Sequence, residues 1–177
     1  MYKFSNSFTE FTQKEINENS KEYFIEILSL LNDKFDLDNF NSILKKFKIG
    51  KVEDIKLDSL DLLISYANFI LKDNIISEIE IQDFSILKRI FRIKEGDFKK
   101  FKNFEINEIL KKEFMRIYSD NYVNDKEQLI NLNLQSLFDL SYDEFENIKK
   151  DEVILSLIQG ANPTDLDISK IPKGFIL

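Results

Sequence analysis

The chain aligns with itself when it is shifted by 47 residues. Residues 73–98 match residues 120–145 without a gap, and the shared positions include an Asp-Asn pair, a glutamate and two phenylalanines. In the order of the chain, Asp73, Asn74, Glu80, Phe91 and Phe98 coincide with Asp120, Asn121, Glu127, Phe138 and Phe145. Each copy has the pattern of a helix end, a turn, a long helix and a short linker into another helix. The sequence therefore predicts an internal duplication of a helical element.

Apolar residues recur at three- and four-residue steps through most of the chain, as on one face of an α-helix. This spacing predicts helices over residues 21–35, 38–47, 59–71 and 106–118, with a connector over 49–58. Only four glycines and two prolines interrupt the 177 residues, which favours long helices joined by short turns. We expect an all-α, single-domain bundle of about eight helices. Residues 1–55 form an extra N-terminal helical segment packed on the core, and residues 56–177 form the duplicated domain with a C-terminal tail.

Both ends of the chain carry apolar residues that need a surface to cover them. Phe4, Phe8 and Phe11 are spaced to form one edge of a helix that docks on the domain or on another chain. Docking within the same chain is the favoured alternative. Residues 168–177, ISKIPKGFIL, are expected to lie against the body of the protein or a partner.

The chain contains neither cysteine nor histidine. Disulfides, thiolate nucleophiles and structural zinc sites are therefore excluded, and the commonest general base and transition-metal ligand is missing. Hard cations held by carboxylate oxygens remain compatible with the composition. The net charge of −7 disfavours nucleic acid and anionic lipid as partners. No apolar run reaches the roughly 20 residues that span a bilayer, so we expect a cytoplasmic protein without membrane insertion.

The two acidic turns, DNIISEIE at residues 73–80 and DNYVNDKE at residues 120–127, have a structural interpretation. Ser77 with Glu80, and Asn124 with Glu127, have the spacing at which a cap residue and a glutamate bond each other's backbone N–H groups. Asn74 and Asn121 suit a left-handed residue after the preceding helix. In this interpretation each turn only begins a helix.

The same turns also allow a metal-binding interpretation. Asp73, Glu80, Asp120 and Glu127 would repel one another if the two copies brought them together, unless a cation such as Ca²⁺ or Mg²⁺ lay between them. An EF-hand is excluded, because the positions four and two residues before each aspartate hold Phe69 and Leu71, or Arg116 and Tyr118. What remains is a looser site for a divalent cation formed by both turns.

The duplicated pattern of helix, D-x-x-[I/V]-x-x-x-E turn, long helix and short helix resembles the tellurite-resistance protein TerB-like family. The resemblance covers residues 60–161, including the closing SLIQGANPTDLD. It implies an all-helical, acidic domain of two related halves, linked to bacterial stress and defence systems, with acidic residues proposed to bind metal. Asn74 and Asn121 stand where the family usually has glycine. Asparagine can keep the turn geometry, so this difference weakens the implied metal ligands more than the implied fold. The first 55 residues lie outside the resemblance.

Basic residues concentrate in KRIFRIKEGDFKKFK, residues 88–102. Lys88, Arg89, Arg92, Lys99 and Lys100 alternate there with phenylalanines that a helical core requires. A solvated helix face is the favoured interpretation, an acidic partner surface the second and single-stranded nucleic acid the third.

No glycine-rich phosphate loop or nucleophile elbow is present in the sequence. We therefore expect no enzyme but an interaction module that binds another protein within a bacterial stress-response or defence system. The alternative is an inhibitor or immunity-type protein that blocks a basic partner through acidic surface. An enzyme with a carboxylate-bound metal is the third alternative.

Overall fold

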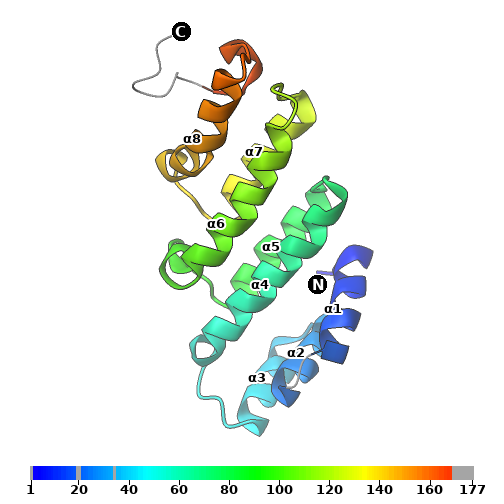
Figure 1. Cartoon of the computed structure of the whole chain (residues 1–177). Coiled ribbons are helices and arrows are strands. Elements are labelled where there is room, and N and C mark those ends of the chain that lie inside the picture. The colour runs from blue at the N-terminus through cyan, green and yellow to red at the C-terminus, as the bar shows by residue number, and fades with distance from the viewer. Residues whose placement is uncertain (1, 19–20, 34, 169–177) are drawn as a thin grey trace. The chain divides into compact units, whose positions relative to one another are not determined.

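The computed structural model describes residues 2–18, 21–33 and 35–168 of the chain (Figure 1). These residues form eight α-helices and three short 3₁₀ helices, and no strand occurs among them. The predicted all-α class and the helix number are therefore confirmed. Within the same ranges, no helix combines the length and apolar character needed to cross a bilayer. The predicted C-terminal tail, apart from Ile168, lies outside the described residues.

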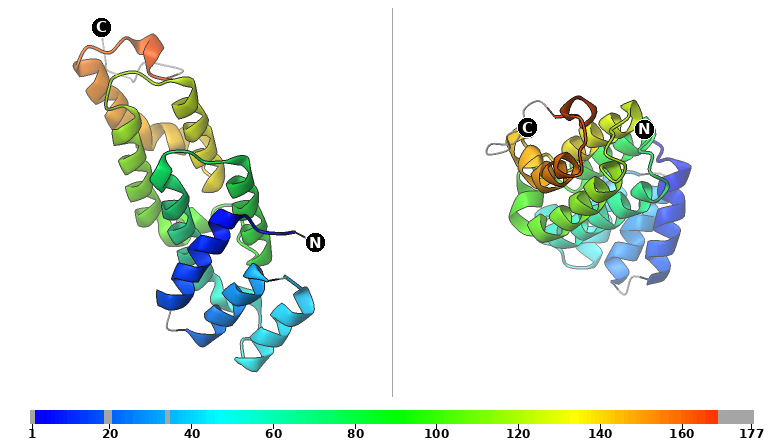
Figure 2. Two further views of the ribbon diagram at one scale, coloured as in Figure 1. Left: turned by 90° about the vertical axis from the view of Figure 1, so that its right-hand side faces the viewer. Right: turned by 45° about the horizontal axis from the view of Figure 1, so that its top comes forward.

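The chain divides into two compact units, unit 1 over Met1–Lys94 and unit 2 over Glu95–Leu177. The predicted boundary after residue 55 falls inside unit 1, between the 3₁₀ helix η1 and α4. It does so because α1 packs against both α4 and α5, so that residues before and after position 55 share one core (Figure 2). Unit 1 contains α1 (Asn6–Glu18), α2 (Glu22–Asn32), α3 (Leu37–Lys46), η1 (Val52–Ile55), α4 (Lys56–Ile70), η2 (Leu71–Asp73) and α5 (Glu78–Ile90). Unit 2 contains α6 (Asp97–Ile117), α7 (Asp125–Leu137), α8 (Tyr142–Ile158) and η3 (Pro163–Asp165).

The two copies of the duplicated sequence have the same helix bounds. Helix α7 (125–137) starts and ends 47 residues after α5 (78–90). Helix α6 has a kink at Lys102, where φ is −135° and ψ is 27°, and its continuation over residues 103–117 lies 47 residues after α4 (56–70). Asn74 and Asn121 both adopt the left-handed conformation, each with φ of 61°. The sequence repeat is thus a repeat of backbone conformation.

Helices α3, α5 and α7 all end in the same way. The helix is followed by an aromatic residue, a left-handed residue with φ of 57°, 52° or 53°, and an aliphatic residue. The aliphatic N–H bonds to the carbonyl five residues earlier, at 2.8, 2.8 and 3.1 Å, as in a Schellman motif. The three sets are Phe47-Lys48-Ile49, Phe91-Arg92-Ile93 and Phe138-Asp139-Leu140. The end of α3 is therefore a third occurrence of this helix-end motif, and it lies outside the two segments that align at a shift of 47 residues.

The core of unit 1 is an aromatic cluster that includes the start of the chain. Phe8 and Phe11 contact the ring of Tyr66 on α4, with centroid distances of 5.3 and 5.0 Å, and Phe4 lies 4.4 Å from Phe8. Tyr66 in turn stacks on Phe84 of α5. The predicted docking of this phenylalanine edge within the chain is confirmed.

The core of unit 2 forms where α6 and α8 pack side by side (Figure 2). The ring of Phe114 on α6 contacts Phe145 on α8 edge to face, with centroids 5.1 Å apart. Phe98 near the start of α6 meets Phe138 at the end of α7 in the same geometry, at 5.5 Å. All four rings are buried, so they anchor the ends of the unit 2 helices.

Candidate functional site

The first acidic turn begins α5. Asp73 Oδ1 accepts a hydrogen bond from the backbone N–H of Ile75 at 3.1 Å. Ser77 and Glu80 form a reciprocal capping box, in which Glu80 Oε2 accepts from the Ser77 N–H at 2.9 Å and Ser77 Oγ accepts from the Glu80 N–H at 3.4 Å. Glu80 Oε1 also accepts from Ser7 Oγ at 2.7 Å. Both carboxylates of this turn therefore hold local backbone, and Glu80 also holds the N-terminal segment.

The second acidic turn begins α7 with the same bonds. Asp120 Oδ1 accepts from the Tyr122 N–H at 3.1 Å. Asn124 and Glu127 form the second capping box, with distances of 3.0 Å from the Asn124 N–H to Glu127 Oε2 and 3.1 Å from the Glu127 N–H to Asn124 Oδ1. The polar residues of both turns therefore have the helix-capping and turn roles that the structural interpretation assigns to them.

The metal interpretation requires several carboxylates close together. Asp73 and Glu80 belong to unit 1, whereas Asp120 and Glu127 belong to unit 2. Among the described residues of either unit, no group of three or more aspartates and glutamates is arranged to hold a metal ion. The hydrogen bonds of the four carboxylates favour helix capping, and a cation shared by both turns stays a prediction.

The basic stretch is divided between the two units. In unit 1, the Lys88 ammonium lies over the Phe84 ring, 5.9 Å from its centroid, and Arg92 Nη1 lies 3.4 Å from Glu53 Oε1 on η1. Arg89 is exposed in the last turn of α5. In unit 2, Lys99 and Lys100 are exposed near the start of α6, and Lys99 forms an ion pair with Glu144. These positions agree with the favoured interpretation of a solvated helix face.

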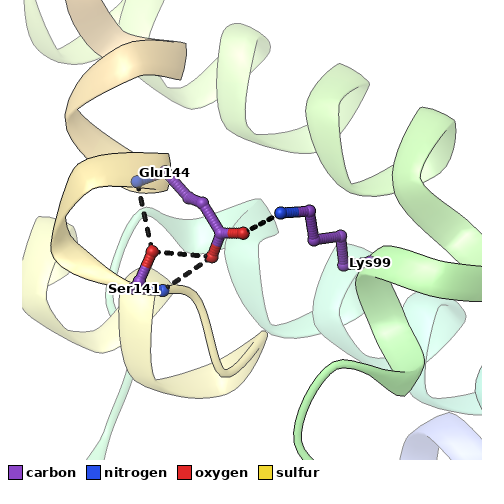
Figure 3. A network of polar contacts seen from close by, with 3 residues as sticks. All are labelled: Lys99, Ser141 and Glu144. Atoms are coloured by element: carbon purple, nitrogen blue, oxygen red, sulfur yellow. Dashed lines mark hydrogen bonds and ion pairs between the residues drawn. The ribbon is translucent and has the colours of Figure 1, made fainter.

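The Lys99–Glu144 pair is part of a small network at the start of α8 (Figure 3). Glu144 forms a capping box with Ser141, whose N–H donates to Glu144 Oε2 at 2.9 Å and whose hydroxyl donates to the same oxygen at 2.8 Å. The Lys99 ammonium, followed by the two Ser141 donors, lowers the pKa of Glu144 to about 2. The network ties the first turn of α6 to the first turn of α8.

Asp83 of α5 is a buried carboxylate to which the sequence analysis assigned no role. It is 0% exposed and accepts hydrogen bonds from the Tyr2 hydroxyl at 2.7 Å, the Tyr66 hydroxyl at 3.2 Å and the Ser5 N–H at 3.2 Å. Burial and then the Asp83 carboxylate raise the pKa of both tyrosines above the ordinary value. Asp83 is therefore the polar attachment point of the N-terminal segment on α5.

Unit 2 contains a second buried polar cluster that joins α7, α8 and the segment after α8. Lys149 is 4% exposed, and its ammonium lies 2.5 Å from Glu146 Oε1 and 3.1 Å from the Asp167 carbonyl oxygen. Asn131 Nδ2 donates to Asp167 Oδ2 at 3.0 Å. Burial, followed by the charges of Asp167 and Glu146, raises the pKa of Tyr118, whose hydroxyl donates to the Leu166 carbonyl.

A cleft of about 390 Å³ opens beside this cluster, and we call it the unit 2 cleft. Its walls come from α7, from the first half of α8 and from residues 163–168. The lining residues are Gln128, Asn131, Leu132, Gln135, Tyr142, Phe145, Glu146, Lys149, Pro163, Thr164, Asp167 and Ile168. The cleft therefore combines apolar walls with amide and charged groups.

An acidic cleft of about 280 Å³ lies in unit 1, and we call it the unit 1 cleft. Its charged lining is four carboxylates, Glu15, Glu18, Asp58 and Asp61, and one ammonium, Lys21. Lys21 and the Tyr23 hydroxyl both bond Asp58. Burial, followed by the charge of Glu18, raises the pKa of Glu15.

The signal for the buried clusters is present in the sequence. Asp83 lies three residues after Glu80 and four before Leu87, and Asn131 lies three residues before Leu134, so both occupy core-facing helical positions. A polar residue at such a position needs a buried partner. The sequence alone therefore predicts that Asp83 and Asn131 are buried polar residues with hydrogen-bond partners, although it does not predict which residues those partners are.

Together, the fold and these clusters define an all-α protein of capped helical hairpins with a polar cleft in each unit. Comparisons with models of protein families, with curated proteins and with solved structures find no match for the chain. The resemblance to the TerB-like family therefore stays a prediction from residues 60–161.

Proposed function

We propose that the chain is a non-enzymatic module that binds another protein. The observation that carries this proposal is the exposure of large apolar side chains on the last two helices. Leu129 and Leu132 on α7 are 55% and 64% exposed, and Leu155 and Ile158 on α8 are 49% and 68% exposed. Each pair is spaced three residues apart and so lies on one side of its helix. Contiguous exposed apolar surface is typical of protein–protein contact sites, and we place the contact surface at these two pairs.

Membership of a bacterial stress-response or defence assembly is part of the same proposal and rests on the sequence resemblance.

Binding of a divalent cation at the acidic turns is a separate part of the proposal. Calorimetric titration with Ca²⁺ and Mg²⁺ tests it. An ion that binds only the folded state raises the melting temperature. Heat of binding in the wild type that is lost in the double variant Asp73→Asn, Asp120→Asn would support a cation at the turns. The absence of both heat and a shift in melting temperature would remove the cation from the proposal.

The test of partner binding is cross-linking of the tagged full chain in cells that encode it, followed by reconstitution with the purified partner. We expect a complex of defined stoichiometry whose dissociation constant rises when Leu155 and Ile158 are both replaced by serine. Both side chains are exposed, so the double variant is expected to fold, and circular dichroism checks this. If no protein reconstitutes a complex with the chain, the proposal is wrong.

The second candidate function is an inhibitor or immunity-type protein for a basic partner, and the unit 1 cleft favours it. Four carboxylates against one ammonium leave this cleft with a net charge of −3, which attracts a basic surface over several ångströms. Glu18→Gln with Asp61→Asn should then lower the association rate and weaken its dependence on salt. An association rate that is unchanged by the double variant and by ionic strength would exclude this function.

A further inference from the structure

Three amide side chains line the unit 2 cleft from one helix. Gln128, Asn131 and Gln135 follow one another on α7 at intervals of three and four residues, so they share one face of the helix. An amide side chain offers an N–H donor and a C=O acceptor, the same two groups that a peptide bond presents. A row of amides along a cleft therefore matches the backbone of an extended peptide.

Part of the hydrogen-bonding capacity in this cleft is unused. Asn131 is 3% exposed, and among the described residues its Oδ1 has no hydrogen-bond partner although its Nδ2 donates to Asp167. A buried acceptor without a partner costs free energy that a ligand N–H would recover. The Lys149 ammonium, with three N–H donors, has Glu146 and the Asp167 carbonyl as partners. The wall can therefore supply both an acceptor and a donor to a ligand.

The charges and the apolar rim restrict the ligand further. Glu146 and Asp167 against Lys149 give the lining a net charge of −1, which disfavours phosphate or a free carboxylate and accepts a neutral or basic group. Leu132 and Tyr142 are 64% and 51% exposed at the same cleft, where they can cover apolar side chains. The volume of about 390 Å³ falls in the range of ligand sites.

We infer that the unit 2 cleft binds an extended segment of the partner protein that carries apolar and basic side chains and no acidic ones. This inference rests on the proposed function and names the site and the partner chemistry for it. The amides on α7 bind the backbone of the segment, Leu132 and Tyr142 contact its apolar side chains, and Glu146 with Asp167 attracts its lysine or arginine.

The probe is a phage-displayed library of random decapeptides selected against the full chain, with the enriched sequences synthesised and measured by fluorescence anisotropy. Leu132→Glu and Leu57→Glu form a matched pair, because both leucines are exposed on a helix and only Leu132 lines the cleft, while Leu57 lies on α4 of unit 1. We expect Leu132→Glu to weaken binding at least about tenfold and Leu57→Glu to change it less than about twofold. Gln128→Ala, which removes an exposed amide of the cleft, should also weaken binding.

The absence of any enriched peptide, an equal loss of binding in the two leucine variants, or enrichment of acidic sequences would overturn the inference. Selected peptides that resemble residues 169–177, with equally strong binding of a synthetic peptide of that sequence, would identify the chain's own C-terminus as the occupant and would also overturn it. A purified partner that binds the wild type and Leu132→Glu equally would sink the inference and leave the proposed function intact.

Discussion

The α4–α5 hairpin of unit 1 and the α6–α7 hairpin of unit 2 have the same backbone conformation and differ in the polar residues that they bury. Their helices, left-handed asparagines and capping boxes correspond at a shift of 47 residues. Asp83 on α5 corresponds to Ile130, however, and Asn131 on α7 corresponds to Phe84. The buried polar residue that holds an end of the described chain is therefore offset by one position between the two copies.

Each of these polar residues attaches a different end of the described chain. Asp83 binds Tyr2 and Ser5 of the N-terminal segment, and aromatic rings fill the space around it. Asn131 binds Asp167 of the segment after α8, and a cleft remains beside it. The repeat sets the backbone conformation, whereas single non-repeated side chains decide whether the space beside a hairpin is filled by aromatic rings, as at α4–α5, or left open as a cleft, as at α6–α7.

The largest expected effect on the free energy of unfolding concerns the α4–α5 hairpin, which packs against the aromatic rings of the N-terminal segment. Phe8 is 0% exposed, and Phe8→Ala removes a ring from the centre of the aromatic cluster, so we expect a loss of about 4 kcal/mol in the free energy of unfolding. Urea denaturation measures the loss, and hydrogen exchange locates it in α4 and α5. The control is Phe104→Ala, because Phe104 is 72% exposed and its removal should cost less than about 0.5 kcal/mol. Similar losses for the two variants would show that the N-terminal segment is not part of the core.

The two buried polar residues should differ in cost. Asp83→Ala leaves the hydroxyls of Tyr2 and Tyr66 and the Ser5 N–H without their acceptor, and we expect it to destabilise the protein by about 3 kcal/mol. Asn131→Ala removes one bond to Asp167 and also the unpartnered Oδ1, so about 1 kcal/mol is expected. Chemical denaturation of both variants makes the comparison. A larger loss for Asn131→Ala would reverse the roles assigned to these two residues.

Because the two copies have the same backbone conformation, we expect equal losses of stability when the N-cap residues of α5 and α7 are replaced. Ser77→Ala and Asn124→Ala each remove the side chain that accepts the backbone N–H of the following glutamate, Glu80 or Glu127, and each should cost about 1 kcal/mol. Thermal unfolding of the single variants and of the double variant gives the values and shows whether they add. A large effect at one cap and none at the other would mean that the two turns are alike only in sequence.

The smallest effect concerns pH and the Glu144 network, whose lysine is not repeated, because Val52 stands 47 residues before Lys99. Because the folded-state pKa of Glu144 is about 2, below its ordinary value of 4.5, its contribution to stability is present above pH 4.5 and is lost as the pH falls toward 2. The pair is solvent-exposed, so the difference between wild type and Lys99→Met should stay below about 1 kcal/mol at pH 7 and vanish near pH 2. Urea unfolding across this pH range measures it, and a difference that grows on acidification would contradict the assignment.

The features that follow from local rules could be predicted from the sequence. Asn74, Asn121 and the two capping boxes depend on residues at most three positions apart, and the structure places them as the cap rules require. The apolar spacing predicts a helix over residues 38–47, and α3 covers Leu37–Lys46. The helix end at Phe47-Lys48-Ile49 was missed because lysine is no signal for a left-handed residue, although its likeness to Phe91-Arg92-Ile93 is visible in the sequence.

The features that depend on distant contacts could not be predicted in the same way. Tyr2 and its acceptor Asp83 are 81 residues apart, and Asn131 and Asp167 are 36 apart. Periodicity marks Asp83 and Asn131 as core-facing, but no local rule says which end of the chain covers them. The unit 2 cleft depends on this choice, because residues 163–168 form one of its walls.

Hydrogen exchange of the full chain, with and without a purified partner, tests most directly whether the α6–α7 hairpin and the unit 2 cleft beside it bind the partner. Slower exchange in α7, along α8 and in residues 163–168, with α1 and α4 unchanged, is the result that we expect. Protection confined to α1 and α4 around Glu15 and Asp61 would contradict it and would move the interaction to the unit 1 cleft.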